Sequence, residues 1–267
     1  MSTTIGTGTP SRNRRSFDAR AAVATERTGG RTVLGTLRSD PPLTLRQTGP
    51  GTVHLVSTAA GPLGGDRLEL RVDVAPGTSL EIASVASTLV LPGPGESVSI
   101  VEAWVGAGAT LRYVPEPTVL AAGCAHRMIV RLTLEEGASV HWREEIVFGR
   151  FGERPGTCHS RFDATVDGVP LLRQEFVVGD PAVDGSPAVY GDARCVGSVL
   201  IVDARTAGPV ADGGAPGEKP SLAEPVLAEG CAVLPLAGPG TLVSALAPDA
   251  AALRERLTWG EKRLRPA

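Results

Sequence analysis

The chain has little of what nucleic-acid-binding and membrane-spanning proteins need. Only two of its 26 basic residues are lysines, and the 267 residues carry a formal net charge of −3. This balance produces no positive field that would attract nucleic acid or an anionic membrane. No stretch approaches the ~18 consecutive apolar residues that span a bilayer, and no apolar core follows the first arginines as in a signal peptide. We therefore expect a cytoplasmic protein with neither nucleic-acid nor membrane partners.

Cysteine and histidine are too sparse for a common metal or catalytic motif, with four of each. There is no CxxC pair, which argues against structural zinc, and no fingerprint of serine hydrolases, zinc proteases or dinucleotide enzymes. Cys124 and His126 are spaced to share one face of a strand, where they could contact a soft metal transiently. Ordinary core or surface roles for both are the alternative. We expect no tightly bound cofactor.

Aromatic residues make up only 4% of the chain, against 33 glycines and 22 prolines. This composition is typical of many short strands joined by turns. One helix is predicted near 249–259, because Asp249 can cap it and Leu253 and Leu257 share a face; Gly260 should weaken or end it. We expect a disordered tail over 1–19, a single mainly β domain over 20–267, and a flexible loop near 204–225.

A loose internal repeat indicates layered sheets. The segments 74–82, 105–113 and 134–142 share an apolar–Gly–apolar pattern and begin 31 and 29 residues apart, with a weaker fourth copy at 227–233. Each copy has the pattern of a strand, a glycine turn and a strand. The repeat predicts stacked hairpins or coils of sheet, β-helix-like or sandwich-like, with one or two short helices. Chance recurrence of glycine turns is the alternative.

Two turns stand out beside the repeat. Asp66 closes the glycine-rich turn 61–66 and precedes residues 67–74, where apolar and charged residues alternate as in a strand with one buried face. Its carboxylate is expected to cap that strand or to serve a polar site on a β scaffold. Asp167-Gly168 is typical of a two-residue hairpin turn.

Acidic residues in apolar surroundings are the remaining candidates for function. Glu144 and Glu145 are adjacent, so strand alternation places one inward and one outward. The inward acid could line a polar passage, because a charge inside a core needs partners or water; otherwise one acid is exposed and the other pairs with Arg143 or Arg150. Pro115 and Pro117 flank Glu116 and force a kinked, extended segment, either a contact surface or a plain connection.

Three motifs in this order and spacing resemble the UreD (also UreH) family of urease accessory proteins. They are Gly61-Pro-Leu-Gly-Gly-Asp-Arg-Leu-Glu-Leu70, Val114-Pro-Glu-Pro-Thr118 and Glu144-Glu-Ile-Val-Phe-Gly-Arg150, with 31–34 and 41–43 upstream. The likeness covers about residues 20–178. It departs at Leu89-Val90-Leu91-Pro92, where the family often has a lysine and an aromatic residue followed by arginine. Such residues anchor interfaces, so partner contacts there would be built differently.

The resemblance implies a mainly β protein that is not an enzyme. Such proteins bind urease apoprotein and recruit UreF and, through it, the GTPase UreG, and nickel is thought to pass through an internal tunnel. A passing cation needs sparse oxygen ligands, since a tight cage would trap it. The residues that match the family in this role are Asp66, Ser87, Thr88, Glu144 and Glu175. The segment Pro115, Glu116, Pro117 and Thr118 is the candidate partner contact.

Two other functions compete with this one. A β-repeat module that binds peptide or carbohydrate would need aromatic residues along one exposed face, and the chain holds ten in all. A metal-assisted hydrolase would use Cys124, His126 and Glu144, but these are few ligands at no recognised spacing. A tightly bound metal ion in stoichiometric amount, together with catalytic turnover, would distinguish the hydrolase from a nickel-delivery scaffold.

Overall fold

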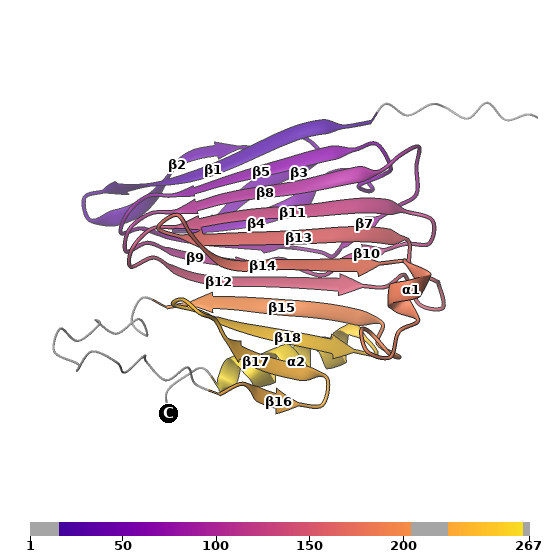
Figure 1. Ribbon diagram of the computed structural model, residues 1–267. Helices are drawn as coiled ribbons and strands as arrows, with labels where there is room; N and C mark the ends of the chain where they lie inside the picture. The colour runs from indigo at the N-terminus through magenta and orange to yellow at the C-terminus, as the bar shows by residue number, and fades with distance from the viewer. Residues whose placement is uncertain (1–15, 204–223, 264–267) are drawn as a thin grey trace, which may run out of the picture.

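The strands of the protein form two sheets that enclose a shared core. The structure, a computed structural model, describes residues 16–203 and 224–263. One sheet has seven strands in the order β14-β13-β11-β8-β5-β1-β2 (Figure 1). Their bounds are β1 Asp18–Thr28, β2 Arg31–Arg38, β5 Arg67–Val74, β8 Ser97–Val105, β11 Ala125–Leu134, β13 Thr157–Val166 and β14 Val169–Val178.

The second sheet has eleven strands. Nine follow the order β16-β17-β18-β15-β12-β9-β6-β4-β3, while β10 pairs with β12 and β7. Their bounds are β3 Leu43–Gly49, β4 Thr52–Ser57, β6 Ser79–Ser84, β7 Thr88–Val90, β9 Thr110–Val114, β10 Thr118–Leu120, β12 Ser139–Val147, β15 Cys195–Val202, β16 Val226–Ala228, β17 Cys231–Pro235 and β18 Thr241–Ala247. The described residues include two helices, α1 Pro181–Asp184 and α2 Ala250–Lys262. A mainly β fold of stacked sheets is confirmed.

The internal repeat corresponds to coils of a β-solenoid-like stack. Each of the first three copies leaves the seven-stranded sheet, turns at a glycine and enters the eleven-stranded sheet, in the pairs β5–β6, β8–β9 and β11–β12. The coils stack as parallel pairs in register, with Val74 opposite Val105 and Val105 opposite Leu134. The three turn glycines, at 77, 108 and 137, have φ of +66°, +62° and +71°. This left-handed conformation favours glycine at each turn.

The fourth copy of the repeat is a different structure. Residues 227–233 form the hairpin of β16 and β17, which are antiparallel neighbours in one sheet. Gly230 lies at its turn with φ of +62°. The local pattern of strand, glycine and strand was therefore predicted, and of the two forms expected, hairpin or coil, this copy has the hairpin. A turn of this kind joins strands within a sheet as well as between sheets.

The repeat aligns core side chains across the coils. Ile82 lies opposite Tyr113, and Tyr113 lies opposite Trp142 on the next coil. The Tyr113 and Trp142 rings stack with centroids 4.0 Å apart, and Phe162 contacts Trp142 edge-on. All four side chains are buried. Large apolar groups therefore fill the space between the sheets at the end where the glycine turns lie.

Helix α2 covers the face of the eleven-stranded sheet that points away from the seven-stranded sheet. Asp249 caps it by accepting a hydrogen bond from the backbone N–H of Ala252, at 2.8 Å, as predicted. Leu253 and Leu257 are buried against β15, β17 and β18. Gly260 does not end the helix, which continues to Lys262. A Cβ at Gly260 would lie 2.4 Å from Cγ1 of Val243, so this glycine permits close approach to β18.

The structure tests part of the predicted tail, loop and hairpin boundaries. β1 begins at Asp18, so the structure places a strand in the last two residues of the expected tail. Residues 1–15 of that tail lie outside the described residues, as do 204–223 of the expected loop. The Asp167-Gly168 hairpin joins β13 to β14, with φ of +50° and +76° at its two turn residues. The hairpin prediction is therefore confirmed.

Candidate functional site: a cavity between the sheets

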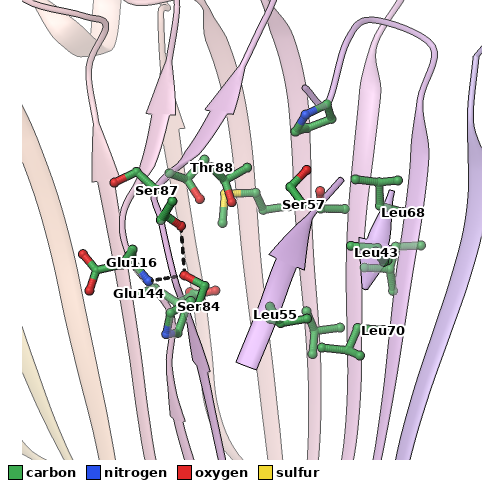
Figure 2. Close-up of a pocket in the computed structure, with 18 of the residues that line it drawn as sticks. Leu43, Leu55, Ser57, Leu68, Leu70, Ser84, Ser87, Thr88, Glu116 and Glu144 are labelled. Carbon is green, nitrogen blue, oxygen red and sulfur yellow. Dashed lines mark hydrogen bonds between the residues drawn. The ribbon is translucent and has the colours of Figure 1, made fainter. Parts of the chain in front are cut away.

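A cavity of about 220 Å³ lies between the two sheets, next to the aromatic stack, whose Tyr113 forms part of its lining. One side of it is apolar, with Leu43, Leu55, Leu68 and Leu70 (Figure 2). The opposite side carries oxygen atoms from two irregular segments and from four strands of the eleven-stranded sheet, β6, β7, β10 and β12. These polar residues are Ser84, Ser87, Thr88, Glu116, Thr118 and Glu144.

Two short parallel strands position the polar side. Thr88 of β7 pairs with Thr118 of β10, and Thr118 pairs with Ile146 of β12, two residues beyond Glu144. The backbone N–H of Glu116 donates to Oγ of Ser84 at 2.8 Å, which joins the proline-flanked segment to the end of β6. The prolines at 115 and 117 keep that segment out of the ladder, as predicted. Sequence-distant oxygen atoms therefore meet on one wall.

Glu144 is the acid whose chemistry the cavity changes most. It extends inward from β12, is 8% exposed, and lies beside Tyr113. Burial raises its pKa to about 7, because a carboxylate without water is poorly solvated. Burial and the nearby Glu144 raise the pKa of Tyr113 as well, so its phenol keeps its proton. Near neutral pH this carboxyl group therefore exchanges readily between its neutral and charged forms.

Glu145 extends to the opposite side of β12 and is also buried. Its side chain is fully covered and pairs with Nε of Arg143 at 2.9 Å and with Nη2 of Arg254 of α2 at 3.3 Å. Strand alternation did predict opposite faces for the two acids. The alternative in which one acid is exposed and the other pairs with Arg143 or Arg150 holds only for the Arg143 pair, because α2 covers the outward face and both acids are buried. Burial raises the pKa of Glu145, and the two arginines act against that shift.

His126 lines the cavity as an uncharged group. It is 2% exposed, and its Nδ1 lies 2.8 Å from Oγ of Ser97. Burial lowers the pKa of its imidazole to about 4. Cys124 is buried in an apolar cluster, and burial raises its thiol pKa to about 11. The described residues contain no group of three or more Cys, His, Asp or Glu placed to hold a metal ion.

Two of the predicted passage residues lie outside the cavity lining. The Asp66 carboxylate accepts hydrogen bonds from the backbone N–H groups of Phe17, at 2.8 Å, and Leu63, at 2.9 Å. It therefore holds the turn to the residue before β1, and neither of these two donors belongs to β5, the strand that it was expected to cap. Glu175 is on β14 and half exposed, and it pairs with Arg161 at 3.1 Å and with His159 at 3.4 Å. The other three candidates, Ser87, Thr88 and Glu144, line the cavity.

The proline-flanked segment lies at the edge of the cavity. Pro115, Glu116 and Thr118 line it, and Glu116 pairs with Arg254 of α2 at 3.1 Å. Pro117 is buried and faces a groove along α2. Arg254 had no signal in the sequence beyond its place in an amphipathic helix. Its contacts with Glu116 and Glu145 exist only because α2 folds back across the sheet.

Known proteins of similar sequence identify the family of this chain. The sequence profile of the family described as UreD urease accessory protein matches residues 18–267. The chain belongs to the UreD family. It is 41% identical to the urease accessory protein UreD of Frankia alni over 97% of this chain and 98% of that protein. The corresponding protein of Frankia casuarinae is 41% identical over 91% and 88%, and that of Parafrankia sp. 42% identical over 92% and 88%.

Membership in the UreD family extends beyond the stretch that the sequence motifs covered. The profile continues through β15–β18 and α2, where the motifs had given almost no likeness. The family is described as one of urease accessory proteins. No helix in the described part of the chain is long and apolar enough to cross a membrane.

Proposed function

We propose that this UreD-family protein is a non-catalytic scaffold for urease maturation that passes nickel through the cavity between its sheets. In this role it binds urease apoprotein in the cytoplasm and recruits UreF and, through UreF, the GTPase UreG. Nickel is its cargo and no resident cofactor is required. The observation that carries the proposal is the buried Glu144 carboxyl group, which extends into a partly open cavity beside serine and threonine oxygens.

The chemistry of Glu144 suits transfer better than storage. A neutral carboxyl group costs little in a buried site, and an arriving cation can displace its proton. When the Glu144 carboxylate regains a proton, its contact with the nickel ion weakens. A single acid with hydroxyl neighbours also supplies too few strong ligands to trap nickel. The binding-module alternative lacks support among the described residues, because Tyr113, Trp142 and Phe162 are used in the core.

The test is Glu144→Gln, which keeps the shape of the side chain and removes its negative charge. In a complete activation mixture at limiting nickel, we expect the nickel content of urease to fall by about fivefold or more, the effect of one lost charge near a cation. Glu175→Gln is the matched control, since Glu175 lies outside the cavity on the surface. Co-purification with UreF checks that assembly is intact. Wild-type nickel incorporation by Glu144→Gln would contradict the proposal.

A further inference from the structure

A second hollow lies against the wall of the cavity. This groove, of about 740 Å³, runs between α2 and the Pro117 region and is more open to solvent than the cavity. Ser87 and Glu116 line both spaces. At these two positions the wall between cavity and groove is therefore only one side chain thick.

The guanidinium group of Arg254 lies at this thin wall. Its Nη2 atom is 3.1 Å from Oε2 of Glu116 and 3.3 Å from Oε1 of Glu145. A single nitrogen thus connects an acid of the wall with an acid buried beneath α2. A fixed positive charge in this position repels any cation that approaches from either side.

Arg254 can leave this position without leaving a buried charge unpaired. Glu145 keeps Arg143 at 2.9 Å, and the Arg254 and Glu116 side chains are 40% and 36% exposed. Ion pairs with this exposure are weakly held. The two prolines stiffen the segment that carries Glu116, so the long Arg254 side chain is the part of the wall that moves most easily.

We propose that Arg254 closes a passage between the cavity and the α2 groove. When the guanidinium moves away from Glu116, the two hollows become one channel with Glu116 and Ser87 at its junction. The freed carboxylate of Glu116 then favours a cation where a positive charge had opposed it, while Glu145 stays paired with Arg143. This inference rests on the proposed passage of nickel through the cavity and adds its opening toward α2.

The first variant opens the passage. Arg254→Met keeps an unbranched, flexible side chain but removes the guanidinium group and its charge, so nickel incorporation into urease in the complete mixture should accelerate by about fivefold, the effect of one unit charge near the path. Arg254→Lys restores the charge and should return the rate toward that of wild type. Arg71→Met is the matched control, because Arg71 is exposed on the outer face of the other sheet. A merely structural role for Arg254 predicts a slower rate, not a faster one.

The second variant blocks the passage. Ser87→Trp fills the junction, so incorporation should fall by more than about tenfold once the space is packed. Thr133→Trp adds the same bulk on an exposed residue of β11 and should leave the rate unchanged. If Arg254→Met fails to fold, as shown by circular dichroism, Ser87→Trp decides the question. If Ser87→Trp loses its partners, Arg254→Met decides it.

The outcomes separate this inference from the function on which it rests. Faster nickel incorporation with Arg254→Met, or strongly slowed incorporation with Ser87→Trp, supports the passage. Wild-type rates for the folded, assembled variants overturn it, while a slow Glu144→Gln in the same mixture would leave the proposed function standing. If Glu144→Gln is also as fast as wild type, the cavity route itself is wrong.

Discussion

The two ends of the space between the sheets differ although the same strands build both. At the end with the glycine turns, the buried side chains of Ile82, Tyr113 and Trp142 fill the space, with Tyr113 bordering the cavity. Further along β6 and β12 the next inward positions are Ser84 and Glu144, and there the cavity opens. The backbone geometry is continuous, so the size and polarity of the inward side chains decide whether the interior is packed or hollow.

The comparison shows how a protein can hold a cavity without losing its fold. The packed end stabilises the fold through apolar burial, at roughly 25 cal/mol per Å². The hydrogen bonds between neighbouring strands run through both ends. The hollow end then needs only short side chains and a few satisfied polar groups. We expect the two ends to respond in opposite ways to changes in side-chain size and charge.

The largest effect is expected from Trp142→Ala at the packed end. Removing a fully buried indole leaves a void and deletes its contacts with Tyr113 and Phe162, so unfolding free energy should drop by about 3–5 kcal/mol. Urea denaturation followed by circular dichroism measures the change. A loss below about 1 kcal/mol would mean that this end is not the packed core.

The next effect is a dependence of stability on pH at the hollow end. The pKa of Glu144 rises from 4.5 to about 7 on folding, so its contribution is present at low pH and is lost as pH rises through 7. The shift amounts to about 3 kcal/mol. Glu144→Gln removes this loss and should therefore be more stable than wild type at pH 8 but not at pH 4.

His126 is expected to act in the opposite direction over nearly the same range. Its pKa falls from 6.5 to about 4 on folding, so its contribution is present above 6.5 and is lost as pH falls through 4. In wild type, the pH-dependent contributions of Glu144 and His126 to stability offset each other. Urea titrations at several pH values should thus show stability rising with pH in Glu144→Gln and falling in His126→Asn. Identical pH profiles for both variants and wild type would refute the burial of these groups.

The smallest effect compares two inward positions on β8. Ala103 is 4% exposed in the packed core, so Ala103→Val should cost about 1–3 kcal/mol through overpacking. Ser99 lines the cavity, so Ser99→Val has room for its methyl groups and should be neutral or stabilising by up to about 1 kcal/mol. Thermal melts of the pair are sufficient. Equal destabilisation by both substitutions would show that the cavity offers no usable space.

The local features of this protein were determined by its sequence alone. Glycine at 77, 108 and 137 predicts turns, alternation over 67–74 predicts a strand, and Asp249 predicts the start of α2. These predictions held because turn chemistry, strand period and helix capping depend on neighbours in the chain. The family motifs also singled out Ser87, Thr88 and Glu144, which the fold brings to one cavity.

Tertiary structure alone decided what covers each side chain. Alternation assigns Glu144 and Glu145 to opposite faces, but only the folding back of α2 buries Glu145 beneath Arg254. The sequence left two roles open for Asp66, a cap or part of a polar site, and only the fold shows that its carboxylate accepts hydrogen bonds from the backbone N–H groups of Phe17 and Leu63. The sequence predicted that Gly260 would weaken or end the helix, whereas in the fold it allows α2 to pack closely against β18. Contacts between sequence-distant residues set solvation and hydrogen bonding, and a local pattern holds no information about them.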